Sequence, residues 1–296
     1  MRSYLDIVEN VLSVGRQKEN RTGVKSYTTF CEIFRHNMSD GFPLLTTKKM
    51  PYRTIAIELE GFIKGITDKG WFQERGCKIW NEWANPKAVE FSHGGVIEML
   101  SNEEFRKKAQ LYENDLGPIY GYQWRAWNQD YGDMVGERHG IDQLRNVIET
   151  LKNNPDDRRM VVSAWNPSQM HLMALPPCHY AFTLVHIDGV LNLCWKQRSA
   201  DLMLGVPFNI ASYGLLLELI CKEVGMVAGE LVGILEDCHI YENHMEGAKK
   251  QLERKPEKLP SLLLSEPYNI YEWTYEDFDI VDYNSDKRID FGQVAV

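Results

Sequence analysis

The chain has 296 residues, 44% of them hydrophobic, and a formal net charge of −9 at pH 7. This length suits one large domain, and because no linker divides the chain, we expect residues 1–296 to form a single domain. The acidic balance argues against DNA or an anionic membrane as partner, since these need clustered Lys and Arg. The amino terminus has no apolar signal core and no segment approaches a membrane span, which predicts a cytoplasmic protein.

The first half of the chain is predicted to combine helices with a strand. Apolar residues at helical spacing predict a helix over residues 5–12 that stops at Gly15, and alternation predicts a strand over residues 26–34. A second helix is predicted over residues 55–65, with Glu58 on or beside its buried stripe. Residues 85–114 are richer in Gly, Ser, Asn and Glu, and we expect them to form a surface insertion.

The second half is predicted to contain most of the sheet. Asp142 is a candidate N-cap for a helix that ends at Asn154-Pro155. Three alternating runs predict strands, the last two joined by the hairpin signal Asp188-Gly189, over residues 160–165, 180–187 and 190–197. An apolar helix is predicted over residues 212–224, closed by Gly225. This order predicts an α/β fold of the α+β type, with helices packed on a mixed central β-sheet.

Six cysteines are spread along the chain without any C-x-x-C pair. This spacing predicts reduced, mostly buried thiols rather than a disulfide framework. The pairs Cys178-His179 and Cys238-His239 lack the two spaced ligands per segment on which soft-metal sites draw. We therefore expect no metal.

Cys178 follows two prolines and precedes His179. Neighbours in an extended segment point to opposite faces, so these two side chains are poorly placed to form a nucleophile and base dyad. A nearby arginine would instead favour the thiolate. Arg198 is the candidate because it follows a neighbouring strand, while a packed structural thiol stays the alternative.

Three other groups have a structural and a functional interpretation. Glu58 is either a boundary glutamate paired with a base or an acid whose pKa burial raises. Arg158 and Arg159 form either a solvated charge run or a pair of forked donors suited to phosphate. Asn209 either belongs to a turn and cap before the apolar helix or presents a donor and an acceptor to a pyrimidine edge.

Eight stretches taken together resemble the thymidylate synthase family over nearly the whole chain. They are residues 20–23, 42–48, 116–121, 157–159, 175–179, 197–199 with Asp201, 205–213 and 239–241. The resemblance implies a homodimer of mixed α/β fold. It also implies that dUMP is converted to dTMP with 5,10-methylenetetrahydrofolate as carbon donor and reductant.

The resemblance further implies roles for individual residues. Cys178 would be the nucleophile that adds to uracil C6, with Glu58 and Tyr120 in proton transfers and Asn209 and Asp201 also in the catalytic set. The nucleotide would contact Arg21, Arg198, Ser199, Gln197, His179, Asn209, His239 and Tyr241, with Arg158 and Arg159 donated by the partner subunit. The folate would contact Trp80, Ile79, Asp201, Leu175, Gly205, Phe208, Ala295 and Val296.

The helix that carries Glu58 departs from the family's usual Glu-Leu-Leu-Trp-Phe, because Glu60 and Gly61 stand in it here. Gly61 costs about 1 kcal/mol of helix propensity relative to Ala, and the missing ring is expected to leave a roomier or wetter pocket. This keeps open a dUMP hydroxymethylase, which ends the shared chemistry with water instead of hydride. A more distant alternative is a catalytically silent member that binds RNA or nucleotide.

Overall fold

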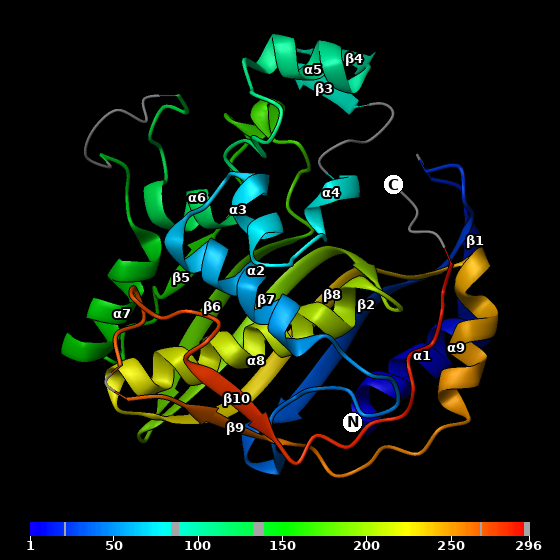
Figure 1. Ribbon diagram of the computed structural model, residues 1–296, viewed down its shortest axis with the longest axis vertical. Helices are drawn as coiled ribbons and strands as arrows, with labels where there is room; N and C mark the ends of the chain where they lie inside the picture. The colour runs from blue at the N-terminus through cyan, green and yellow to red at the C-terminus, as the bar shows by residue number, and fades with distance from the viewer. Residues whose placement is uncertain (21, 84–88, 133–138, 267, 293–296) are drawn as a thin grey trace.

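A six-stranded mixed sheet forms the centre of the computed structural model (Figure 1), which describes residues 1–20, 22–83, 89–132, 139–266 and 268–292. Its strands, in spatial order, are β1 (Arg16–Lys18), β2 (Ser26–Asn37), β8 (Val227–Tyr241), β7 (Val190–Asp201), β6 (His179–Ile187) and β5 (Val161–Ser163). The β7–β8 pair is parallel and the other pairs are antiparallel. The predicted mixed sheet is therefore confirmed.

Helices cover one face of this sheet. The helix α8 (Gly205–Val224) packs on β7 and β8, α1 (Arg2–Val14) packs on β2 and β8, and α2 (Tyr52–Lys64) lies against α8. Gly15 and Gly65 follow α1 and α2, as predicted. The predicted start of α8 is wrong, because the helix begins at Gly205 rather than at residue 212. Pro207 lies in its first turn, where a missing N–H breaks no helical hydrogen bond.

The remaining elements frame the sheet and its helices. The predicted Asp142 cap is confirmed, since its side chain accepts a hydrogen bond from the Arg145 amide. The hairpin turn between β6 and β7 has positive φ at both Asp188 and Gly189, as its sequence predicts.

The other elements outside residues 85–114 are η1 (Met38–Asp40), α3 (Lys69–Glu74), α4 (Trp80–Trp83), α6 (Tyr120–Ala126), α7 (Gln143–Asn153), η2 (Met170–Leu172), η3 (Glu242–His244), α9 (Met245–Leu252), β9 (Ser261–Leu264) and β10 (Phe278–Val281).

The segment expected to be an insertion contains the hairpin β3 (Val89–His93) and β4 (Val96–Leu100), followed by α5 (Asn102–Ala109). These elements project at the top of Figure 1. They bury a small apolar cluster of their own, centred on Phe91 and Phe105 and separate from the main core. The part of the segment at residues 85–88 lies outside the described residues.

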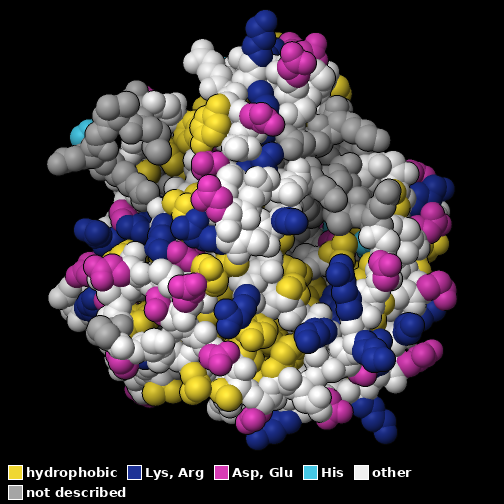
Figure 2. Space-filling view, in the orientation of Figure 1, with side chains coloured by type: hydrophobic (Ala, Val, Ile, Leu, Met, Phe, Trp, Pro, Cys, Tyr) yellow, Lys and Arg dark blue, Asp and Glu magenta, His cyan; other side chains and the backbone are white. Residues whose placement is uncertain are grey.

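The other face of the sheet carries exposed apolar side chains. Phe182 and Leu184 of β6 are buried under the helices, so Val185 and Ile187, which are exposed, belong to the opposite face. Phe30 and Ile33 of β2 are also exposed, Phe30 to 86%. On the side shown in Figure 2, acidic and basic side chains are interspersed among groups of apolar ones. An apolar face on the central sheet therefore remains uncovered in the single chain.

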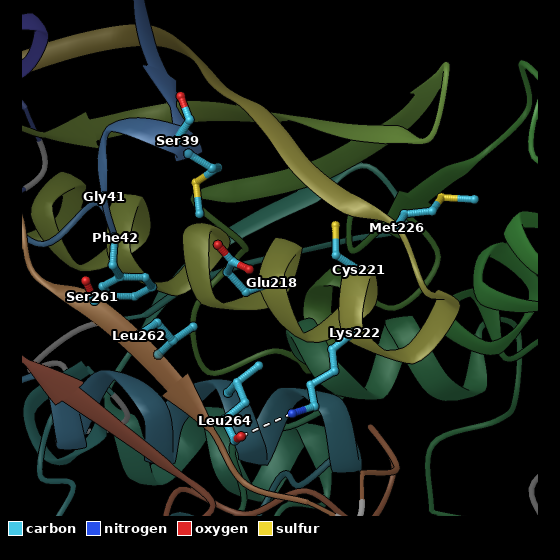
Figure 3. Close-up of a pocket in the computed structure, with 11 residues that line it drawn as sticks. Ser39, Gly41, Phe42, Glu218, Cys221, Lys222, Met226, Ser261, Leu262 and Leu264 are labelled. Carbon is cyan, nitrogen blue, oxygen red and sulfur yellow. Dashed lines mark hydrogen bonds between the residues drawn. The ribbon is translucent and has the colours of Figure 1, made fainter.

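A cavity of about 490 Å³ opens between η1, α8 and β9 (Figure 3). Glu218, Cys221 and Phe42 are among its lining residues, and none of the predicted site residues lines it. In the described part of the chain, no helix is long and apolar enough to cross a membrane.

Candidate active site

The register of the sheet gathers most of the predicted site residues at one end. In the parallel pair β7–β8, Asp201 lies opposite His239, so both strands finish together. In the antiparallel pair β6–β7, His179 at the start of β6 lies opposite Gln197 near the end of β7. Cys178 directly precedes β6 and therefore lies at the same end as Arg198 and Ser199.

The loop that carries Cys178 is held from two sides. The Cys178 amide donates to the Tyr120 hydroxyl at 2.8 Å, and the Arg198 amide donates to the Cys178 carbonyl at 2.9 Å. The Arg198 guanidinium donates through Nε to the Pro177 carbonyl at 3.0 Å and through Nη2 to the Pro176 carbonyl at 2.9 Å. The guanidinium is thus fixed against the backbone that directly precedes Cys178, whose side chain is half-buried.

His179 is turned away from Cys178 into the core. Its Nδ1 and the Tyr213 hydroxyl share a hydrogen bond of 2.9 Å, and burial lowers the pKa of the imidazole to about 3. Tyr213 lies four residues after Asn209 on α8, one helical turn along the same face, and sequence reasoning missed it. A neutral, inward-facing imidazole does not serve as the base for Cys178.

Glu58 is buried on α2, and burial raises the pKa of its carboxyl to about 7. The nearby Trp80 indole partly opposes this shift. This contact is weak, because the buried Trp80 Nε1 does not reach a partner with the geometry of an ordinary hydrogen bond. The raised pKa agrees with the interpretation of Glu58 as an acid whose ionisation burial opposes, whereas a boundary glutamate paired with a base would keep a low pKa.

Tyr120 lies between Cys178 and Glu58. Burial raises the pKa of its phenol well above the usual range. The negative charges that Cys178 and Glu58 carry when they are ionised add to this shift. Its backbone has a φ of 25°, unusual for a residue other than glycine. The ring stacks on Phe62 at 4.9 Å and lies 4.4 Å from the His179 ring. Packing thus holds a strained residue in place at the site.

The Asn209 amide is oriented by a chain of contacts. Gln197 Nε2 donates to Asn209 Oδ1 at 3.0 Å and to the Ser199 carbonyl at 3.0 Å. The Trp195 indole in turn donates to Gln197 Oε1 at 3.1 Å. The Trp195 ring occupies the space over Gly233 of β8, where an added Cβ would lie 2.3 Å from Trp195 Cζ2. The asparagine side chain therefore has a fixed direction.

His239 lies in an acidic environment beside this network. Its Nδ1 is 3.1 Å from Asp237 Oδ1. Burial by itself lowers the pKa of the imidazole, but the Asp237 hydrogen bond and the Asp201 charge outweigh it, so the pKa is raised. The Tyr241 ring packs edge-on against His239 at 5.0 Å. Asp201 Oδ1 accepts the Met203 amide at 2.9 Å, which turns the chain from β7 into α8.

Apolar side chains predicted to contact the folate lie around the site. Trp80 packs against Phe62 and Tyr120. Leu175 is buried, and Ile79 and Phe208 are partly buried against the core. A Cβ added to Gly205 would lie at an ordinary contact distance of 3.9 Å from both Asn209 Oδ1 and the Asp201 Cβ, so Gly205 lies between these two residues.

Arg158 and Arg159 are not at this end of the sheet. Their turn leads into β5, whose Val161 pairs with Thr183 of β6, and the adjacent Asp156 contacts His186 at 3.0 Å. His186 is seven residues beyond His179 along β6, which corresponds to roughly 23 Å. The two arginines are thus too far from Cys178 of their own chain to share a ligand with it. Arg21, Ala295 and Val296 lie outside the described residues.

The expectation of a roomier pocket beside Gly61 is wrong. The Phe72 ring of α3 fills the space, since a Cβ on Gly61 would lie 2.3 Å from Phe72 Cε1 and 3.3 Å from Trp71 Cζ3. Glu60 is directed elsewhere, because it pairs with Lys64 at 2.5 Å and accepts the Tyr275 amide at 2.9 Å. The departure from the family pattern is compensated by an aromatic ring from another helix.

Among the residues that the structure describes, no three His, Cys, Asp or Glu side chains gather as a metal site. No disulfide joins the described cysteines, of which Cys77, Cys221 and Cys238 are buried.

Comparisons with known proteins agree with this arrangement. A thymidylate synthase family model matches residues 2–296. Thymidylate synthases from Listeria monocytogenes serotype 4b, strains CLIP80459 and F2365, are 40% identical over an alignment of 314 residues that covers 98% of each chain. The bifunctional dihydrofolate reductase-thymidylate synthase of Paramecium tetraurelia is 40% identical over 289 residues, which cover 97% of this chain and 60% of the relative.

Proposed function

The chain belongs to the thymidylate synthase family, and we propose that the site around Cys178 performs the reaction of that family. The reaction is dUMP plus 5,10-methylenetetrahydrofolate giving dTMP plus dihydrofolate. The observation that carries the proposal is the position of Cys178 between the Arg198 cation and the Tyr120 hydroxyl, with Glu58 buried nearby.

Cys178 is the nucleophile in this proposal. The Arg198 charge favours the thiolate, whose sulfur bonds to uracil C6 while the C5=C6 electron pair moves towards O4. Asn209 fits the uracil edge, because its Oδ1 has a second lone pair for N3–H and its amide N–H can donate to O4. Gln197 holds the amide in the orientation that this pairing requires.

Glu58 and Tyr120 handle the protons. With a pKa of about 7, Glu58 exchanges a proton with the uracil O4 region through water at physiological pH. Tyr120 stays a neutral phenol because its pKa is raised. Its oxygen accepts the Cys178 N–H, which leaves its own O–H to relay the proton from C5. When the C6–sulfur bond breaks, the thiolate is restored beside Arg198.

The residues present fit a folate. The Trp80 ring packs against Tyr120, Ile79 is its neighbour in the chain, and Leu175 and Phe208 lie within three residues of Cys178 and Asn209, which supports an apolar wall beside the site. Trp80, these three residues, Gly205 and Asp201 would hold the co-substrate, with Ala295 and Val296 proposed from the family resemblance. When bound, the folate supplies the one-carbon unit and the hydride.

We propose that the protein works as a cytoplasmic homodimer. The uncovered apolar face of the sheet, with Phe30, Ile33, Val185 and Ile187, supports pairing of two sheets. Arg158 and Arg159 lie too far from Cys178 of their own chain, which supports their donation to the partner's nucleotide phosphate. In each site Arg198, Ser199 and Arg21 would bind the same phosphate, and His239 and Tyr241 the deoxyribose hydroxyl.

The hydroxymethylase alternative depended on the Glu60 carboxylate and on extra space beside Gly61, and Glu60 is held by Lys64 and the Tyr275 amide. The Phe72 ring occupies that space, which favours exclusion of water and a methyl product.

The test combines product analysis with covalent trapping. Purified protein with dUMP and methylenetetrahydrofolate should yield dTMP and dihydrofolate in equal amounts. Hydroxymethyl-dUMP with tetrahydrofolate left unoxidised would contradict the methylation proposal. Cys178→Ala should bind dUMP but form no covalent complex with 5-fluoro-dUMP and folate, whereas the matched control Cys194→Ala should form it. A peptide map with the analogue on another cysteine would remove Cys178 from this role.

A further inference from the structure

Asp157 and Arg159 form an unusually complete contact for surface residues two positions apart. Arg159 donates to Asp157 Oδ1 from its amide at 2.8 Å and from Nε at 3.0 Å, and to Oδ2 from Nη2 at 2.7 Å. The Arg159 side chain is 88% exposed, whereas that of Asp157 is 12% exposed. The carboxylate is thus tucked into the turn, and the guanidinium extends into solvent in one fixed direction.

The fold itself gains little from this contact. Ion pairs between exposed side chains usually contribute little to stability, and Arg159 touches no part of the core. A bidentate contact, in which Nε and Nη2 of an arginine donate to the two oxygens of one carboxylate, however, fixes the plane of the guanidinium as well as its position. The edge formed by Nε and one Nη2 hydrogen is occupied by Asp157, so the remaining donors at Nη1 and Nη2 form the outward edge.

The surroundings of this outward edge suit an anion. The turn surrounds a hollow of about 440 Å³ lined by Asn154, Asp156, Asp157, Arg158 and Arg159. Both Asp157 oxygens are already paired with Arg159, and the neighbouring Arg158 also lowers the pKa of Asp157. Asp156 contacts His186 instead. The donors that remain for an anion in the hollow are therefore the outward edge of Arg159 and the exposed Arg158 side chain, with the exposed Asp156 carboxylate held towards His186.

We propose that Asp157 is a positioning residue that presents the Nη1–Nη2 edge of Arg159 to the nucleotide phosphate in the partner's site. This inference rests on the proposed function, in which Arg159 crosses the dimer interface. An arginine that is already immobilised loses less rotamer freedom on binding, so preorganisation strengthens phosphate binding without touching the reacting atoms.

The test is steady-state kinetics with dUMP. Asp157→Asn keeps the shape of the side chain but weakens its bidentate contact with Arg159. The variant should raise KM for dUMP roughly three- to ten-fold, while kcat changes less than about two-fold. Asp157→Glu should recover part of the loss. The matched control Asp6→Asn weakens another exposed carboxylate–arginine contact, that of Arg2 Nε with Asp6 Oδ1 at 2.8 Å, and should leave KM unchanged.

A double-mutant cycle with Arg159→Ala decides whether Asp157 acts through that arginine. Arg159→Ala should raise KM, and adding Asp157→Asn to it should have no further effect. An unchanged or lower KM in Asp157→Asn, or an equal rise in the Arg159→Ala background, would overturn the positioning role while leaving the proposed function intact. If Arg159→Ala alone leaves KM unchanged, the donation of Arg159 across the interface fails as well.

Discussion

The buried carboxyl of Glu58 should make the stability of the protein depend on pH in a predictable direction. Its pKa is raised by burial from the ordinary value of 4.5 to about 7. Each pKa unit corresponds to about 1.4 kcal/mol of free energy. Ionising Glu58 in the folded protein therefore costs roughly 3 kcal/mol more than in the unfolded chain. Glu58→Gln removes this cost, because an amide of nearly the same shape never ionises.

The direction in which stability changes with pH follows from the raised pKa of Glu58. Below about pH 4.5 the carboxyl is neutral in both states, so the wild-type protein bears no ionisation cost. Between pH 4.5 and 7 the unfolded chain ionises first, so wild-type stability falls relative to that of Glu58→Gln. Above pH 7 the difference should reach its full value of roughly 3 kcal/mol in favour of the variant.

Urea denaturation of both proteins between pH 4.5 and 8.5 measures this difference. Protein concentration must be equal throughout, because the stability of an oligomer depends on it. The same variant should lose about 10²- to 10⁴-fold in kcat, as expected when a general acid–base group is removed. A stability difference that stays constant across this pH range would refute the argument that Glu58 is buried as a neutral acid.

Three further substitutions test individual contacts. Gly61→Ala should destabilise the protein by about 1–3 kcal/mol in urea denaturation, because its Cβ would lie 2.3 Å from Phe72 Cε1; full stability would show that space exists there. Asn209→Asp should lose dUMP turnover by tens-fold and gain turnover of dCMP, and an unchanged base preference would exclude Asn209 from uracil recognition. Tyr213→Phe leaves the buried His179 Nδ1 without its partner and should cost about 1–3 kcal/mol, which a melting temperature equal to that of wild type would contradict.

Local signals in the sequence were sufficient for several elements. The Asp188-Gly189 hairpin, the Asp142 cap and the glycines that end α1, α2 and α8 act within a few residues, so the chain itself encodes them. The start of α8 was misplaced because Gly205 and Pro207 resemble a turn, although both are tolerated in a first helical turn.

Features that depend on distant partners were not predictable in the same way. The long strand β8 was not predicted, and it contains Gly229 and Gly233, which weaken a strand pattern. Gly233 is accommodated because the Trp195 ring from β7 covers it. Phe72 likewise compensates for Gly61 from a separate helix. No periodicity within one segment reveals such pairings, whereas the family motifs did indicate the residues that gather at the end of the sheet.

The contacts from Gly233 through Trp195 and Gln197 to Asn209 have an evolutionary consequence. Any side chain larger than hydrogen at Gly233 would displace the Trp195 indole, and the shift would pass through two hydrogen bonds to the amide that faces the base. Base selection in a lineage could therefore drift through a substitution on a neighbouring strand, with every nucleotide-contacting residue unchanged. Ancestral variation at Gly233 and Trp195 should then be inherited as a pair.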